Sequence, residues 1–310
     1  MEVGRTLNSI IRWLKEPWRI LVSPKIGNLS HLVPDRLYLY SQYRVLLGEK
    51  PDLRAPRNYN EKLQWLKLHD RKPVYTQWVD KYEVKEYVRR TLGEEYVVPA
   101  YGVWDSFDDI DWDCLPERFV LKCTHDSAGL VICRDKATFD KASAREKLTR
   151  CMKRNFYYSG REWPYKHIKP RILAEQYLED TVLGELRDYK FMTFNGVPRV
   201  MHLVSNRQNP DEETYGDFFD MEFRHLDLTM GHINAPVCPE KPENFERMKE
   251  FAAKLAKDTA HIRVDFYEVD GRLYFGELTF YQDSGYAEVL PPHWSGELGN
   301  WIDLKKVRSN

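Results

Sequence analysis

Residues 263–280, RVDFYEVDGRLYFGELTF, carry the side chains with the clearest capacity for chemistry. Because successive side chains of a strand point to opposite faces, one face of this stretch collects Arg263, Asp265, Glu277 and Thr279. The other face is apolar, with Val264, Phe266, Tyr274, Leu278 and Phe280. Two adjacent carboxylates repel each other unless a cation lies between them, and oxygen ligands of this kind suit Mg²⁺. The alternative is an ordinary solvated strand face.

The loop of this hairpin decides whether its two strands share a buried face. The apolar residues of both strands have even numbers. They face one side only if even-numbered residues pair with even-numbered residues across the hairpin, so that the two numbers of each pair add up to an even number. That register requires a three-residue loop rather than a two-residue loop. We therefore expect Asp270 and Gly271 to lie in a bulged turn.

Candidate phosphate contacts follow the apolar run of residues 119–121. Lys122 ends this run, and the small polar loop after it offers His125, Ser127 and Gly129 together with backbone N–H groups. The loop lacks the GxxxxGK[ST] order, so it is not a P-loop. The alternative for Lys122 is a strand-end lysine whose ammonium reaches water.

A second hairpin supplies further cations. Asn195-Gly196 is a strong signal for a tight turn between residues 189–194 and 197–204. A two-residue turn there places Lys190 and Arg199 on one face, where both are available for phosphates.

Short helices and strands must position these residues. Periodicity and composition predict helices at residues 60–70, 80–92, 141–156 and 244–258, the first with Leu63, Trp65 and Leu66 inward. Strands are predicted on both sides of the loop within 116–133, at 171–178 and in the two hairpins. Antiparallel hairpins covered by helices indicate an α+β fold.

Composition excludes several classes of protein. The 310 residues are 42% apolar and 14% aromatic, which excludes a disordered chain. The formal net charge of −1 makes no case for a nucleic-acid partner, and we find no apolar stretch long enough to span a bilayer. We find no secretory signal at the start. The 5 cysteines include no CxxC pair, which favours a reducing, cytoplasmic compartment.

The charge is nevertheless uneven, because residues 1–75 hold fourteen Lys or Arg and seven Asp or Glu. Residues 10–22 have an amphipathic helical pattern that Pro17 must kink. This segment is either a peripheral contact with an anionic membrane surface or a helix docked on the rest of the protein.

The ordered set DKYEVKEYV, LPERFVLKCTHDSAG, ILAEQYLED, DYKF and RVDFYEVDGRLYFGELTF resembles the ATP-grasp superfamily. Within it, the chain is most similar to the TupA-like branch, which is found in bacterial surface-polysaccharide gene sets, from about residue 57 to residue 303. The resemblance implies an α+β ATP-grasp fold, in which two subdomains with antiparallel sheets clamp ATP, preceded by a helical extension. The implied parts are a basic N-terminal region at 1–75, a first subdomain with the phosphate loop at 76–170 and a second subdomain with the metal site at 171–310.

The resemblance also implies roles for individual residues. The phosphate contacts are Lys81, Lys122, Lys190 and the loop residues His125, Ser127 and Gly129. Glu175 begins a hinge in which Tyr177 and Leu178 bind adenine through their backbones, and either Glu179 or Glu185 binds the ribose. Asp265 and Glu277 correspond to Mg²⁺ ligands. Thr279 stands where family members usually have Asn as a third ligand. Arg263 and Lys190 are the catalytic candidates, Arg263 steadying the reacting acyl group.

The expected function is that of an ATP- and Mg²⁺-dependent, ADP-forming carboxylate-amine ligase. It would attach an amino acid or small amine to a uronic-acid-type sugar or glycan carboxylate during capsular or surface polysaccharide synthesis. Alternatives are a kinase acting on a hydroxyl at the same ATP site and a glycosyltransferase of the same pathway. The expected location is cytoplasmic, with possible peripheral contact at the inner face of the membrane.

Overall fold

The computed structural model describes residues 17–207 and 213–308, and their strands form antiparallel sheets. A 4-stranded sheet has the order β1-β4-β2-β3, with β1 Ala100–Trp104, β4 Ile172–Gln176, β2 Phe119–Cys123 and β3 Leu130–Cys133. A 5-stranded sheet has the order β10-β9-β5-β6-β7, with β10 Arg272–Thr279, β9 His261–Val269, β5 Asp188–Phe194, β6 Val197–Ser205 and β7 Tyr215–Phe219. A small third sheet pairs β8 Thr229–Met230 with β11 Val289–Leu290.

Helices cover these sheets, so the predicted α+β class is confirmed. The α-helices are α2 Asp35–Leu47, α3 Tyr59–His69, α4 Val74–Val79, α5 Val84–Thr91, α6 Lys141–Met152, α7 Tyr157–Gly160, α8 Phe245–Leu255, α9 His293–Trp301 and α10 Lys305–Arg308. The 3₁₀ helices are η1 Pro17–Val22, η2 Pro24–Leu32, η3 Glu94–Tyr96, η4 Phe107–Asp109, η5 Trp163–Tyr165 and η6 Gln282–Gly285. Four of the α-helices, α3, α5, α6 and α8, match the predicted helices to within a few residues.

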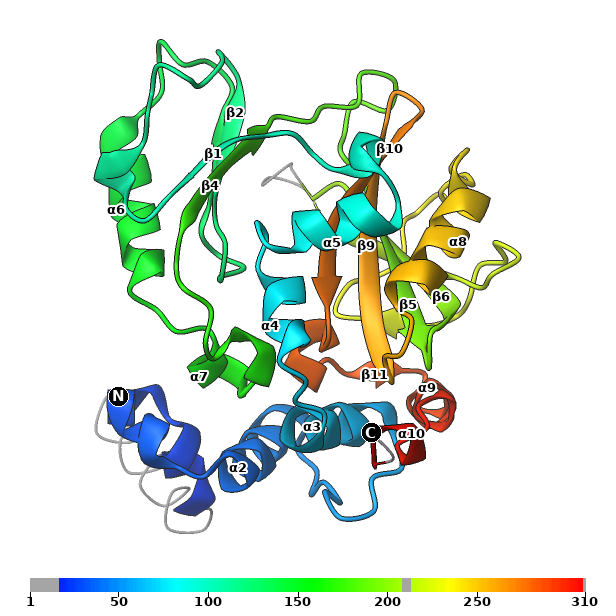
Figure 1. The fold of residues 1–310 in the computed structure, drawn as a ribbon. Coiled ribbons are helices and arrows are strands. Elements are labelled where there is room, and N and C mark those ends of the chain that lie inside the picture. The colour runs from blue at the N-terminus through cyan, green and yellow to red at the C-terminus, as the bar shows by residue number, and fades with distance from the viewer. Residues whose placement is uncertain (1–16, 208–212, 309–310) are drawn as a thin grey trace, which may run out of the picture.

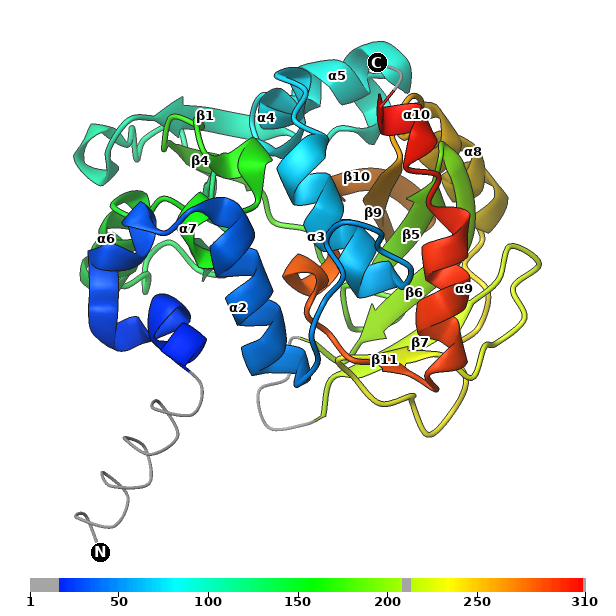
Figure 2. The same ribbon diagram turned by 90° about the horizontal axis from the view of Figure 1, so that it is seen from below.

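The two large sheets lie on opposite sides of the molecule. Figure 1 shows the 4-stranded sheet with α6 on one side and the 5-stranded sheet with α8 on the other, while α2 and α3 lie beneath both. Seen from below, α2 and α3 cross the base between α7 and α9 (Figure 2). The described part of the chain contains no helix long and apolar enough to cross a membrane.

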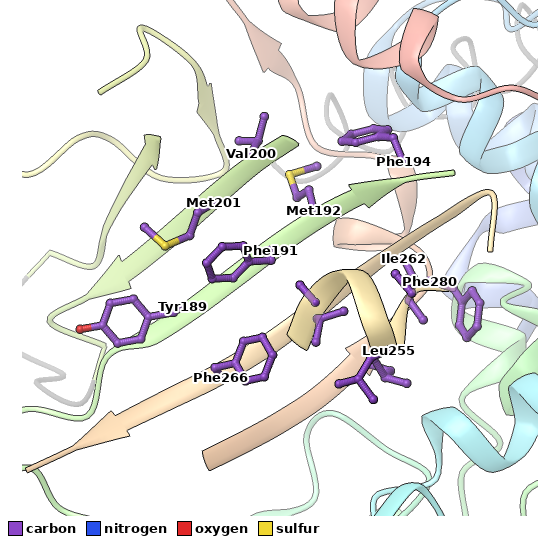
Figure 3. Close-up of a cluster of buried hydrophobic side chains, with 14 of the residues drawn as sticks. Tyr189, Phe191, Met192, Phe194, Val200, Met201, Leu255, Ile262, Phe266 and Phe280 are labelled. Carbon is purple, nitrogen blue, oxygen red and sulfur yellow. The ribbon is translucent and has the colours of Figure 1, made fainter. Parts of the chain in front are cut away.

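The hydrophobic core follows this arrangement. The main cluster packs α8 on the 5-stranded sheet, and Figure 3 shows Phe191 and Phe266 of the sheet beside Leu255 of the helix. The same cluster includes Val79 and Val84 from α4 and α5. A separate cluster lies between the 4-stranded sheet and α6. The three-part division at residues 75 and 170 stays a proposal.

The hairpin of β9 and β10 corrects one prediction. Asp270 and Gly271 both have positive φ, 48° and 77°, and close a two-residue turn in which Val269 pairs with Arg272. The bulged turn predicted there is therefore wrong. The extra residue enters later, because the register shifts between Phe275 and Leu278. A bulge adds one residue to one strand and re-aims the side chains beyond it.

The displaced bulge has two consequences. Tyr274 pairs with Tyr267 rather than joining the apolar face, and Phe275 takes its place in the main core. Beyond the bulge, Arg263 pairs with Thr279, as the even register requires. Gly276 fits at the bulge because a Cβ there would lie 3.1 Å from the carbonyl oxygen of Asp265.

A bulge also corrects the prediction for Arg199. The register of β5 and β6 shifts between Met192 and Thr193, so Lys190 pairs with His202. Arg199 is exposed and lies over the Trp301 ring, 5.3 Å from its centroid. It does not share a face with Lys190.

The predicted amphipathic segment at 10–22 lies partly outside the described residues. Its described part, Pro17–Val22, is a 3₁₀ helix with Ile20 exposed. Helix α3 matches its prediction, with Leu63, Trp65 and Leu66 buried. Its first turn is closed by a capping box between Asn58 and Glu61.

Helix α9 packs closely on the start of α3, and Gly299 lies at this contact. A Cβ at Gly299 would lie 2.5 Å from the backbone oxygen of Arg57, whereas a Cβ at Gly296 of the same helix meets nothing within 4 Å. We expect Gly299→Ala to lower the free energy of unfolding by about 2 kcal/mol. Gly296→Ala should raise it by up to about 1 kcal/mol through helix propensity. Urea denaturation measures both, and equal effects would contradict this packing.

Candidate active site

The charged face of β9 and β10 forms one buried hydrogen-bonded cluster. Arg263 Nε donates to Asp265 Oδ1 at 2.7 Å, and its Nη2 donates to Asp265 Oδ2 at 2.7 Å and to Glu277 Oε1 at 2.8 Å. Lys190 Nζ donates to Asp265 Oδ2 at 2.6 Å. Arg263, Asp265 and Lys190 are buried, whereas the Glu277 side chain is 39% exposed. Glu277 is therefore the carboxylate of this cluster most open to a ligand.

Thr279 and Gln282 complete the cluster. The Thr279 hydroxyl accepts from Arg263 Nη2 at 3.1 Å and donates to Glu277 Oε1 at 3.0 Å. The Gln282 side-chain oxygen accepts from Arg263 Nη1. Arg263 is thus held from three sides, and its side chain has little freedom to turn.

Charge compensation governs the ionisation of this cluster. Burial alone would raise the pKa of Glu277, but Arg263, Lys81 and Lys190 hold that pKa at about 2. Burial would lower the pKa of Arg263, but Asp265 and Glu277 raise it instead. Glu277 is therefore ionised at neutral pH and available as a ligand.

The donor set fits Mg²⁺ bound together with phosphates. The described residues contain no group of three His, Cys, Asp or Glu side chains arranged to hold a metal by themselves. Asp265 and Glu277 lie within reach of the same guanidinium nitrogen, and the Thr279 hydroxyl is beside them. Mg²⁺ is typically bound by one or two carboxylates plus substrate phosphate oxygens, and this set provides the protein's share of such a site.

The 4-stranded sheet contributes a second ionic cluster around Glu175. Lys122 Nζ lies 2.6 Å from Glu175 Oε2, and Lys85 of α5 pairs with Oε1. Burial opposes ionisation, but Lys122 and Lys85 hold the pKa of Glu175 at about 2. Lys122 is therefore paired inside the molecule rather than extended into water. Because Lys85 lies within a predicted helix, the strand patterns did not identify it.

The predicted phosphate loop leaves β2 directly after this cluster. Lys81 is tied to the loop, since its Nζ donates to the Asp126 carbonyl oxygen at 2.9 Å. His125 is buried, with Nε2 3.1 Å from the Arg154 carbonyl oxygen, and burial lowers the pKa of its ring. Gly129 packs against Cys123, where a Cβ would lie 2.5 Å from Sγ. Ser127 is exposed. The phosphate contacts assigned to these residues stay predictions.

The predicted hinge borders an open cavity of about 690 Å³. Tyr177, Leu178 and Glu179 line it together with Arg118. Arg118 pairs with Glu179 and lies over the Tyr177 ring, 4.4 Å from its centroid. Glu185 lies elsewhere, where it pairs with Arg187 at 2.7 Å and accepts from the Asn206 backbone. The structure thus brings Glu179 together with the hinge, and the choice of ribose carboxylate stays a prediction.

Sequence reasoning missed His202. It pairs with Lys190 across β5 and β6 and stacks on Phe218 with ring centroids 4.2 Å apart. Although His202 is only 3% exposed, neither ring nitrogen has a partner among the described residues. Burial, reinforced by Lys190 and Arg263, lowers the pKa of this imidazole, so a neutral donor and acceptor lies beside the Lys190 end of the site. Strand alternation alone would place His202 on the same face as Lys190 only if the bulge between β5 and β6 were known in advance.

Two antiparallel sheets, each with an ionic cluster, are consistent with the ATP-grasp fold that the sequence resemblance implies. The family model described as TupA-like ATPgrasp matches residues 61–303, and the chain therefore belongs to the TupA-like ATP-grasp family. This confirms the resemblance deduced from the sequence. No curated protein matches the chain.

Solved structures of ligases match part of the chain. D-alanine–D-alanine ligase from Bacillus anthracis matches with 16% identity and a TM-score of 0.42, over 75% of this chain and 68% of that enzyme. The Helicobacter pylori enzyme matches with 12% identity and a TM-score of 0.39, over 75% and 60%. N5-carboxyaminoimidazole synthetase from Staphylococcus aureus matches with 15% identity and a TM-score of 0.40, over 74% and 51%.

The cluster around Glu175 makes a pH-dependent contribution to stability. The pKa of Glu175 lies at about 2 in the folded protein, against its usual 4.5, so its ion pairs stabilise the fold fully above pH 4.5. That stabilisation is lost as the pH falls from 4.5 to about 2. We expect Glu175→Gln to lower the free energy of unfolding by about 3 kcal/mol at neutral pH, with the difference shrinking across this window.

Denaturation at a series of pH values checks this expectation. Glu179→Gln removes an exposed ion pair and serves as the control, with an effect below about 1 kcal/mol. A difference between wild type and Glu175→Gln that does not change with pH would contradict the assigned ionisation.

Proposed function

We propose that this protein is an ATP-dependent, ADP-forming carboxylate-amine ligase. The observation that supports it best is the buried cluster in which Arg263 and Lys190 hold Asp265 and Glu277 together. Such a cluster combines metal-ligating oxygens with cations aimed at the same point, as phosphoryl transfer to a carboxylate requires. Family membership supports ATP as the phosphoryl donor.

In this proposal the 4-stranded sheet and the hinge bind most of the nucleotide, and the 5-stranded sheet binds the metal and the γ-phosphate. Adenine binds at the hinge beside Tyr177 and Leu178, where the cavity lies. The phosphates extend toward Lys122 and Lys81, and their γ end meets Lys190 on the other sheet. Asp265, Glu277 and Thr279 would hold Mg²⁺, which would neutralise part of the charge of the phosphates.

The proposed reaction has two steps. A carboxylate oxygen of the first substrate attacks the γ-phosphorus of ATP, the bond to the β-phosphate oxygen breaks, and an acyl phosphate and ADP form. The nitrogen of a neutral amine then attacks the acyl carbon, the bond from that carbon to the phosphate oxygen breaks, phosphate leaves, and the nitrogen gives up one proton to solvent. Arg263 offsets the negative charge that develops on the acyl oxygen, an effect worth about 3 kcal/mol for one well-placed donor.

The similarity to the TupA-like branch, found in bacterial surface-polysaccharide gene sets, supports the choice of substrate classes. We propose a uronic-acid-type sugar or glycan carboxylate and an amino acid or small amine, joined by an amide bond during synthesis of a bacterial surface polysaccharide. We place this reaction in the cytoplasm and propose that residues 10–22 contact the inner face of the membrane.

ADP release provides the first test. With Mg²⁺-ATP and a panel of uronic acids and amines, we expect ADP and free phosphate only when a carboxylate and an amine are both present. A coupled ADP assay measures this. A stable phosphoester with no free phosphate would identify a kinase instead, and nucleotide-sugar turnover without ATP would identify a glycosyltransferase.

Glu277→Gln tests the metal assignment. The amide keeps the size of the side chain but removes its charge, so we expect Mg²⁺-dependent turnover to fall at least about a hundredfold. Circular dichroism should show an unchanged fold. Turnover close to that of the wild type would remove Glu277 from the metal site.

A further inference from the structure

Helix α3 carries a stripe of polar side chains that are buried rather than solvated. Asn60, Gln64 and Lys67 lie four and three positions apart, so they share one face of the helix. They are only 5%, 0% and 0% exposed. Buried polar groups are normally hydrogen-bonded, and a buried ammonium is costly without several acceptors. This stripe must therefore have specific partners.

The partners belong to η6 and the residues next to it. Asn60 Nδ2 donates to the carbonyl oxygens of Gly285 at 3.1 Å and Ala287 at 2.8 Å. Gln64 Nε2 donates to the carbonyl oxygens of Ser284 at 3.1 Å and Gly285 at 2.9 Å. One helix face thus holds the backbone of a segment more than 200 positions away along the chain.

Lys67 adds the strongest connection. Its ammonium donates to the Ser284 carbonyl oxygen at 2.7 Å, to Ser284 Oγ at 2.9 Å and to the Gly160 carbonyl oxygen at 2.7 Å. Burial lowers the pKa of the Lys67 amino group to about 7, and the buried carboxylate of Glu162 opposes that shift. Lys67 therefore joins α3, α7 and η6 at one point.

The conformation of η6 explains why it needs this support. Asp283, Ser284 and Gly285 have consecutive φ values of 45°, 55° and 68°. The left-handed region costs an L-residue about 1 kcal/mol, so two such non-glycine residues persist only where their surroundings hold them. Gly285 also allows the close approach of α3, since a Cβ there would lie 2.5 Å from Gln64 Nε2.

Helix α3 is connected through η6 to the reaction centre. The first residue of η6 is Gln282, whose oxygen accepts from Arg263 Nη1 and whose Nε2 donates to Asp283 Oδ2 at 2.8 Å. Displacing Ser284 and Gly285 would therefore move Gln282 and release one side of Arg263.

We propose that Asn60, Gln64 and Lys67 are positioning residues of the active site, holding η6 so that Gln282 orients the Arg263 guanidinium. The kinetic consequence rests on the function proposed above, whereas the structural connection does not. Helix α3, which lies in the basic N-terminal region, then contributes to the site. Loss of these contacts should lower the rate of the chemical step without weakening nucleotide binding.

Lys67→Met and Lys62→Met form a matched pair that tests this. Lys62 lies on the same helix and also donates from Nζ to two carbonyl oxygens, of Gly299 and Ile302, each at 2.8 Å, but it does not reach η6. Gln64→Met provides a second variant that removes a contact with η6 without removing a charge. All variants are measured at a temperature where circular dichroism shows them folded.

The first readout is the ¹⁵N–¹H resonance of Arg263 Nε, assigned by its loss in Arg263→Lys. We expect it to shift in Lys67→Met and Gln64→Met and to stay in place in Lys62→Met. An unchanged resonance in both of the first two variants would overturn the proposal, whatever the activity of the protein.

The second readout is carboxylate-dependent ADP release together with the Kd for Mg²⁺ and a non-hydrolysable ATP analogue. We expect kcat to fall about tenfold in Lys67→Met and Gln64→Met, with Kd within about threefold of the wild type, and Lys62→Met to resemble the wild type. Equal kcat values in Lys67→Met and Lys62→Met would overturn the kinetic claim. If the wild type itself releases no ADP while the resonance shifts, the proposed ligase function fails and the positioning role stands.

Discussion

The placement of the buried carboxylate of Asp265 beside the partly exposed carboxylate of Glu277 is the constraint on which the site depends. Asp265 and Glu277 approach the same nitrogen of Arg263, and Lys190 takes another lone pair of Asp265. Removing charges from water is costly, and the mutual attraction offsets that cost only when the geometry is good and the remaining hydrogen bonds are made. Thr279 and Gln282 make those remaining bonds to Arg263.

Several features of the fold follow from this constraint. The bulge in β10 sets the register that pairs Arg263 with Thr279, and Gly276 allows the strands to approach there. The residues after the strand turn back through η6, which brings Gln282 to Arg263. Helix α3 supports η6 through Lys67. One of the basic residues among the first 75 positions therefore makes an internal contact rather than a surface one. The cluster around Glu175 balances charges in the same way on the other sheet.

Much of the site could be predicted from the sequence because strand alternation is a local property. The face shared by Arg263, Asp265, Glu277 and Thr279 required only the period of two residues, and the structure brings all four together. The predictions failed where the register depends on a bulge. Asp270 and Gly271 form a tight two-residue turn, and the extra residue of the hairpin lies in β10 next to Glu277 instead of in the turn. A second bulge, between β5 and β6, explains why Arg199 does not share a face with Lys190 and why His202 was not predicted as its neighbour. In α3, the apolar pattern identified Leu63 and Leu66 but not the buried polar stripe, because polar helical residues usually face water.

Calorimetric titration of the protein with a non-hydrolysable ATP analogue, with and without Mg²⁺, measures whether the site binds nucleotide and metal together. If Asp265 and Glu277 are metal ligands and Lys122 and Lys190 contact phosphates, one nucleotide should bind per chain, about tenfold or more weakly without Mg²⁺. The Asp265→Asn variant should lose this dependence on Mg²⁺. Nucleotide binding that is indifferent to Mg²⁺ in the wild type, or no binding at all, would contradict the account.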